Sequence, residues 1–137
     1  MTIQKDVVTL WDDGFDKLCL FPVPDDAKYN YIDGLPCITI GISYENEKYK
    51  GCDTFTLFDR SYTELINTIN KTYCCLNGVF RLYDMGADTD GYINFQMNKG
   101  KLCVKGQLGA SFSSHSLAFS FEADQTLLER LMQSLSV

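Results

Sequence analysis

Between Ile38 and Tyr44 the apolar residues occupy every second position, and Thr39, Gly41 and Ser43 fill the positions between them. A period of two places alternate side chains on opposite faces of an extended chain, so one face packs on a core while the other stays more polar. The same alternation returns in residues 117–122, where Leu, Phe and Phe alternate with Ala, Ser and Glu. The chain is therefore constrained to build much of its fold from half-buried strands.

The remaining strand candidates are separated by turn-forming residues, which predicts hairpins between neighbours in sequence. Asp12-Asp13-Gly14 and Asn98-Lys99-Gly100 are typical of tight turns. We expect strands at residues 7–11 and 17–21, a hairpin of 38–44 with a strand through 55–57, and a meander of 79–83, 92–97 and 102–108. From residue 22 to residue 34 the composition favours an irregular acidic loop.

Helical spacing appears twice. Ser61-x-x-Glu64 has the pattern of a capping box and predicts a helix near residues 60–74, and Asp124 is a suitable N-cap for a helix over 124–135 with an apolar face. The predicted fold is α+β, with antiparallel β-sheets in a sandwich-like or strongly twisted arrangement and these two helices covering one side or end. No repeat or linker interrupts the sequence, so we expect a single domain over residues 1–137.

Composition narrows the function classes. The 137 residues carry a net charge of −6 and the basic residues are scattered, which argues against nucleic acid as a partner. Apolar runs are too short for a membrane span or a signal sequence, so we expect no membrane partner and a cytoplasmic location. In that compartment the six cysteines are expected as reduced thiols.

We find no catalytic motif and expect no cofactor and no metal. His115 is the only histidine, and no nucleophile signature surrounds it. Residues 88–91, Asp-Thr-Asp-Gly, imitate part of an EF-hand loop, but the first ligand position would be Gly86 and the twelfth Met97. A hairpin turn is the better interpretation of this segment.

Carboxylates interleaved with aromatic residues make residues 12–33 the best candidate for a partner-binding surface. This mix favours electrostatic steering together with aromatic anchoring at a protein interface. The predicted partner-binding residues are Asp12, Asp13, Asp16, Asp25, Asp26, Tyr29, Tyr31 and Asp33.

From about residue 59 to residue 135 the chain resembles a family of small bacterial proteins encoded beside polymorphic toxins, the immunity family named for the partner of a wall-associated tRNA-cleaving toxin. The likeness consists of the first helix, the segments 78–82 (GVFRL) and 100–106 (GKLCVKG), the turn ending in Asp90-Gly91, and the junction 117–127 (LAFSFEADQTL). The resemblance implies a non-enzymatic inhibitor that neutralises a cognate toxin domain by binding it. The acidic balance of the chain suits a basic nuclease as that toxin.

Two alternatives remain open at the level of sequence. One is a small-ligand binder or enzyme with a pocket near His115. The other is a structural subunit of a homo-oligomer, for which a homodimer is the simplest form.

Overall fold

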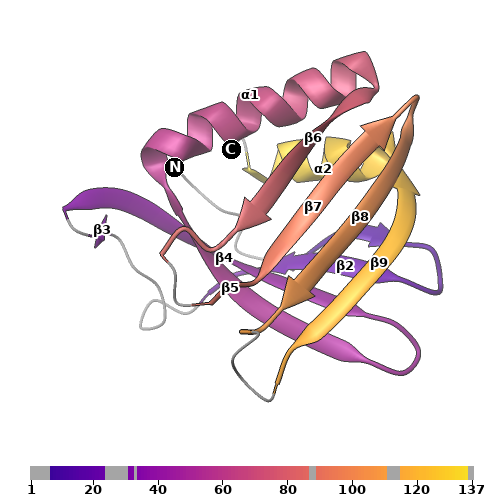
Figure 1. The fold of residues 1–137 in the computed structure, drawn as a ribbon, viewed down its shortest axis with the longest axis horizontal. Coiled ribbons are helices and arrows are strands. Elements are labelled where there is room, and N and C mark those ends of the chain that lie inside the picture. The colour runs from indigo at the N-terminus through magenta and orange to yellow at the C-terminus, as the bar shows by residue number, and fades with distance from the viewer. Residues whose placement is uncertain (1–6, 24–30, 33, 87–88, 111–114, 136–137) are drawn as a thin grey trace.

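The computed structural model describes residues 7–23, 31–32, 34–86, 89–110 and 115–135, and for residues 31–32 the backbone alone. Two antiparallel sheets and two helices make up these residues, which confirms the α+β prediction (Figure 1). In chain order the elements are β1 (Val8–Asp12), β2 (Lys17–Phe21), β3 (Tyr31–Ile32), β4 (Leu35–Glu45), β5 (Lys50–Phe58), α1 (Asp59–Cys75), β6 (Asn77–Tyr83), β7 (Tyr92–Asn98), β8 (Lys101–Leu108), β9 (Leu117–Asp124) and α2 (Gln125–Leu135).

The first sheet is centred on β4, the strand predicted most clearly from alternation. β4 pairs with β2 on one side and with β5 along most of its length, and the short β3 pairs with its first residues. Glu45 lies opposite Lys17 in β2 and opposite Lys50 in β5. Because these three residues form one row of the sheet, the β1–β2 turn and the β4–β5 turn lie at the same end of the molecule.

The second sheet is the predicted meander, extended by one strand, with the order β6-β7-β8-β9. Lys99 and Gly100 both have positive φ, of 53° and 85°, and form the two-residue turn between β7 and β8. Positive φ at both central positions defines a type I′ turn, whose twist matches that of the strands it joins.

One hydrophobic core joins both sheets to both helices. α1 buries Leu65 and Ile69, α2 buries Leu127 and Leu131, and Phe55 of the first sheet lies in the same cluster. α1 contacts β4, β5 and β6, whereas α2 contacts α1, β1 and β9. The helices therefore lie together on one side of the molecule and bridge the two sheets (Figure 1).

The helix boundaries show where local motifs were and were not sufficient. Asp124 does cap α2, because its Oδ1 accepts a hydrogen bond from the Thr126 amide at 2.9 Å. The Ser61 capping box was wrong: α1 begins at Asp59, and its N-cap, Phe58, makes no side-chain cap hydrogen bond. β5 runs directly into the helix. Ser61 therefore already lies inside the first turn, so it cannot serve as the N-cap residue.

Candidate functional site

The β1–β2 turn is held by its own aspartates. Asp12 Oδ1 accepts a hydrogen bond from the Gly14 amide at 3.1 Å, and Asp13 Oδ1 accepts from the amides of Phe15 and Asp16 at 2.9 and 2.8 Å. The Asp13 amide also donates to the Asp16 carbonyl oxygen at 3.3 Å. These hydrogen bonds keep the pKa of the Asp13 carboxyl below its usual range, the Asp16 and Phe15 amides being the largest causes.

The β4–β5 turn is built in the same way around one asparagine. Asn46 Oδ1 accepts hydrogen bonds from the amides of Lys48 and Tyr49, both at 2.9 Å, and the Asn46 amide donates to the Tyr49 carbonyl oxygen at 2.9 Å. Asparagine and aspartate at this position imitate a backbone turn with their side chains. Both turns are thus closed by short side chains rather than by packing.

Tyr44 connects the two turns. Its hydroxyl donates to Asp16 Oδ1 and accepts a hydrogen bond of 3.2 Å from Asn46 Nδ2. The ring stacks on Phe119 of the second sheet, with centroids 4.3 Å apart and planes 7° apart. Burial, followed by the hydrogen bond to Asp16, raises the pKa of the Tyr44 hydroxyl, so it stays a neutral donor near pH 7.

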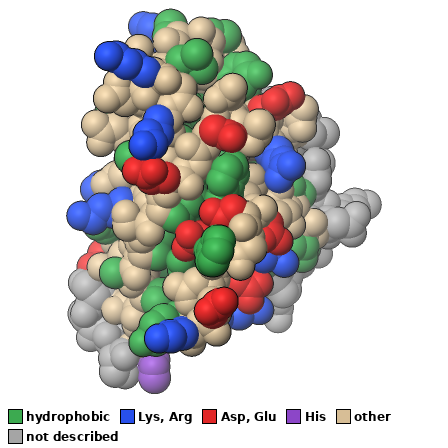
Figure 2. Space-filling model, turned by 90° about the vertical axis from the view of Figure 1, so that its right-hand side faces the viewer, with side chains coloured by type: hydrophobic (Ala, Val, Ile, Leu, Met, Phe, Trp, Pro, Cys, Tyr) green, Lys and Arg blue, Asp and Glu red, His purple; other side chains and the backbone are tan. Residues whose placement is uncertain are grey.

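Each turn presents one aromatic ring to solvent. Phe15 is 72% exposed and Tyr49 is 61% exposed, although the hydrogen bonds above fix the backbone beneath them. We call residues 12–17 and 45–50 together the twin-turn surface. Its charged members are Asp12, Asp13, Asp16, Glu45 and Glu47 against Lys17, Lys48 and Lys50. Figure 2, which faces this end of the molecule, shows acidic side chains gathered around exposed hydrophobic ones.

The structure brings together part of the predicted partner-binding set. Asp12, Asp13 and Asp16 meet in one turn, while Tyr31 lies in β3, where the structure describes its backbone pairing with Pro36. The remaining predicted residues, Asp25, Asp26, Tyr29 and Asp33, lie outside the described residues.

Sequence analysis missed Asn46 and Tyr49. The signal was present, because an asparagine directly after a strand, with an aromatic residue three positions later, is a turn that displays a ring. The proximity of this turn to Asp13 could not be read locally, since it depends on the pairing of β2 with β4.

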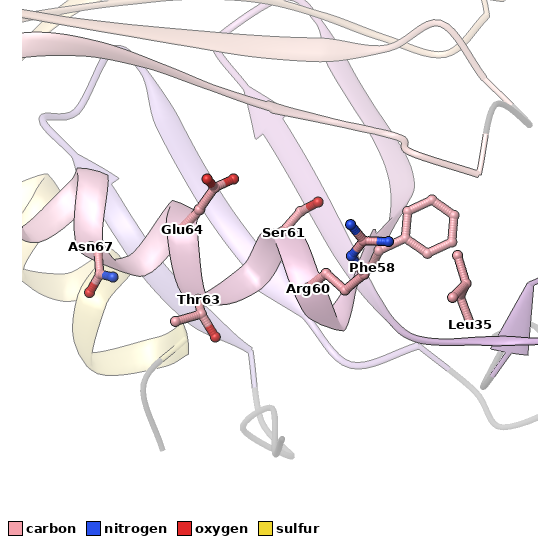
Figure 3. Close-up of a pocket in the computed structure, with 7 residues that line it drawn as sticks. All are labelled: Leu35, Phe58, Arg60, Ser61, Thr63, Glu64 and Asn67. Atoms are coloured by element: carbon pink, nitrogen blue, oxygen red, sulfur yellow. The ribbon is translucent and has the colours of Figure 1, made fainter.

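A separate hollow of about 530 Å³ lies beside the first turns of α1 (Figure 3). Its lining residues are Leu35, Phe58, Arg60, Ser61, Thr63, Glu64 and Asn67. The polar tips diverge, with Ser61 and Glu64 pointing one way and Thr63 and Asn67 the other. Small-molecule sites instead have polar groups that converge on the ligand. His115 is exposed, lies between β8 and β9, and does not line this hollow.

The carboxylates between the two sheets have a structural role. Asp84 is buried and accepts hydrogen bonds from the amides of Thr56 at 2.9 Å and Thr89 at 3.0 Å. Asp53 Oδ2 accepts from the Gly109 amide at 2.9 Å and from the Thr89 hydroxyl at 3.1 Å. In the part of the chain that the structure describes, no three His, Cys, Asp or Glu side chains are placed to hold a metal ion.

Comparisons with protein-family models, curated proteins and solved structures found no match to this chain. Neither helix of the described residues is long and apolar enough to cross a membrane.

Proposed function

We propose that the protein is a non-enzymatic, protein-binding inhibitor of the immunity type, which neutralises a cognate toxin domain by occupying it through the twin-turn surface. The observation that carries the proposal is the exposure of Phe15 and Tyr49 on two turns whose backbones are fixed by hydrogen bonds. The resemblance of residues 59–135 to immunity proteins supplies the class of partner.

Fixed turns favour this surface as a binding site because binding then orders little. Immobilising a mobile side chain or loop reduces affinity, and a pre-ordered surface avoids most of that cost. Aromatic residues supply most of the energy at hot spots of protein interfaces. Phe15 and Tyr49 are exposed rings on ordered backbone, so we infer that they act as the two anchors.

Charge favours a basic partner. The twin-turn surface carries five carboxylates and three lysines, and Glu45 offsets one of these lysines through a 3.8 Å ion pair with Lys17. A nuclease that attracts phosphates is itself basic near its active site. An acidic surface with two aromatic anchors is therefore suited to blocking such a site, and long-range attraction would speed the encounter.

The direct test is a pull-down with the protein encoded by the neighbouring gene, followed by calorimetry. We expect tight one-to-one binding, and we expect Phe15→Ala or Tyr49→Ala to weaken it by about thirtyfold, the loss typical of a hot-spot residue. Val7→Ala is the matched control, because Val7 is 64% exposed but lies just before β1, at the end of that strand opposite the turn. Its affinity should stay within about twofold of the unmodified protein.

Two results would refute the placement or the function. Unchanged affinity in both aromatic variants would remove the twin-turn surface from the interface. Absence of any binding to the neighbouring gene product would remove the immunity role. A separate kinetic check is Glu47→Lys, which should lower the association rate at low salt and have a smaller effect at high salt.

A further inference from the structure

The open edge of β6 follows from the hydrogen-bond pattern of the second sheet. The type I′ turn at Lys99-Gly100 is closed by the pair Asn98 and Lys101, which exchange both backbone hydrogen bonds. Hydrogen bonding alternates along an antiparallel strand, so Met97 and every second residue before it direct their backbone groups toward β6.

The register then assigns the backbone groups of β6. The residues of β7 that direct their backbone groups toward β6 lie opposite Gly78, Phe80 and Leu82. These three residues therefore form the backbone hydrogen bonds between β6 and β7. The N–H and C=O groups of Val79, Arg81 and Tyr83 consequently point away from β7. In the described part of the chain no further strand pairs with β6 on that side. Among the described residues, no hydrogen bond reaches these backbone groups from another element.

A groove runs along this edge. α1 and β6 meet at residues 75–77 and diverge toward the other end of the helix (Figure 1). The hollow between them is about 430 Å³, and its lining includes Glu64 of α1 and Val79, Arg81 and Tyr83 of β6. A helix on one side and a strand edge on the other is the arrangement in which extended peptides add to a sheet.

The outer edge of β5, unlike that of β6, is protected by hydrogen bonds. On β5, Asp84 accepts the Thr56 amide, the Met85 amide donates to the Thr56 carbonyl oxygen at 2.8 Å, and Asp53 Oδ1 accepts the Thr54 amide at 2.8 Å. Proteins commonly cover or charge their edge strands to prevent unwanted pairing. β6 instead exposes Val79 and Tyr83, residue types that favour strand pairing.

We propose that the α1–β6 groove binds an extended segment of a partner protein, which pairs antiparallel or parallel with β6 as an added strand and carries a basic side chain toward Glu64. This interaction surface is independent of the twin-turn surface and does not rest on the immunity role.

The charges of the groove select the partner. Its charged lining residues are Glu64 and Arg81. Arg81 is already engaged, since its Nε donates to Asn94 Oδ1 at 2.7 Å and its guanidinium carbon lies 4.5 Å from the centre of the Tyr92 ring. Glu64 forms no ion pair with any described residue, so a lysine or arginine of the partner is its natural complement.

A second copy of the chain would meet unfavourable contacts in the groove in at least one register. Two-fold antiparallel pairing centred on Arg81 would place two guanidinium groups opposite each other, which is unfavourable across a strand pair. Each copy would also bring its own α1 beside the edge. A single extended segment requires neither contact.

The test uses the full chain and peptides selected from a phage-displayed random library, with hydrogen exchange of backbone amides as the readout. The expected result is an alternating pattern: a bound peptide slows exchange at Val79, Arg81 and Tyr83, while Phe80 and Leu82 are protected already in the free protein. A side-chain contact without strand pairing does not produce this alternation.

Variants locate the peptide. Arg81→Pro removes an outward N–H without breaking the β6–β7 ladder and should weaken peptide binding by about tenfold or more. Ser120→Pro on β9 is the matched control, because its N–H also points away from its sheet and peptide binding should not change. Glu64→Gln, an exposed helix position, keeps the fold in any case and should weaken binding of peptides that carry a basic residue.

Three outcomes would overturn the proposal. The first is that bound peptides slow exchange at no amide of β6. The second is that peptide binding is lost in the Phe15→Ala variant, because such peptides would occupy the twin-turn surface. Concentration-dependent protection of Val79, Arg81 and Tyr83 without peptide would show that a second copy is the occupant.

Discussion

Tyr44→Phe tests the connection between the two turns most directly. The substitution deletes one hydroxyl, which donates to Asp16 Oδ1 and accepts from Asn46 Nδ2. The ring and its stacking on Phe119 are retained. Any loss of stability therefore reports the two hydrogen bonds and not the packing.

The magnitude follows from the partners. A neutral hydrogen bond contributes about 0.5–1.5 kcal/mol net, and one to a charged group about 1.5–3 kcal/mol. Asp16 is half-buried and Asn46 is exposed, so in the variant water can partly replace the hydrogen bond that each of them makes to the Tyr44 hydroxyl. We therefore take the lower part of the summed range and expect a loss of about 2 kcal/mol in the free energy of unfolding. For a chain of 137 residues this corresponds to a decrease of roughly 7 °C in Tm.

The assay is equilibrium unfolding in urea, followed by the fluorescence of Trp11. Trp11 is the single tryptophan, and its Nε1 donates to Asp13 in the same turn, so it reports on this end of the molecule. Tyr62→Phe is the matched control: Tyr62 is half-buried, burial raises its pKa, and its hydroxyl has no hydrogen-bond partner among the described residues. That variant should change stability by less than about 0.5 kcal/mol.

The reasoning fails if Tyr44→Phe costs no more than Tyr62→Phe. It also fails if a double-mutant cycle of Tyr44→Phe with Asp16→Ala shows no coupling, because the two side chains are in direct contact and coupling of at least about 0.5 kcal/mol is expected.

Three further predictions concern stability. Asp84→Leu should lower the free energy of unfolding in urea by about 2–4 kcal/mol, because it leaves the buried Thr56 amide without an acceptor. A loss as small as that of a surface substitution would contradict the structural role of Asp84. Gly109→Ala and Gly14→Ala both place alanine at positive φ, 84° and 87°. A Cβ at Gly109 would clash with the backbone oxygen of His115, whereas no atom lies within 4 Å of a Cβ at Gly14. The first variant should therefore be the less stable by about 2 kcal/mol or more in thermal unfolding, and equal stabilities would rule out the clash. The pKa of the Asp13 carboxyl is lowered in the folded state. The contribution of this carboxylate to stability is therefore present above the pKa of the unfolded chain and is lost as pH falls through the folded value. Acid titration followed by Trp11 fluorescence should show a transition that the Asp13→Asn variant lacks.

The sequence was most informative where one face of a strand is buried. Lys17–Phe21 was predicted with the bounds that the structure shows, and 117–122 was predicted two residues short of β9. Patterns of period two are set by burial, so they survive in the fold. The helix near residues 60–74 was predicted to within one residue of each end of α1, but the Ser61-Glu64 capping box is not formed, because the length of β5 places the helix start at Asp59.

The candidate site could be predicted only in part. The turn-forming aspartates predicted the β1–β2 turn, and their charge indicated that this turn lies on the surface of the protein. The role of Tyr44 was not accessible, because its apolar ring satisfied the alternation and its hydroxyl meets Asp16 only through the register of β2 with β4. Side chains brought together by strand pairing between distant segments carry no local signature.

The path of the chain through the two sheets also determines how the protein can fold. Every strand of the second sheet pairs with its neighbour in sequence, and in the first sheet β1 pairs with β2 and β4 with β5, so most pairings close short loops. Short loops cost little entropy to close, and proteins dominated by such pairings fold faster than other β-rich proteins. Each sheet can form within its own stretch of chain, whereas the stacking of Tyr44 on Phe119, which joins the sheets, is a contact between residues far apart in sequence.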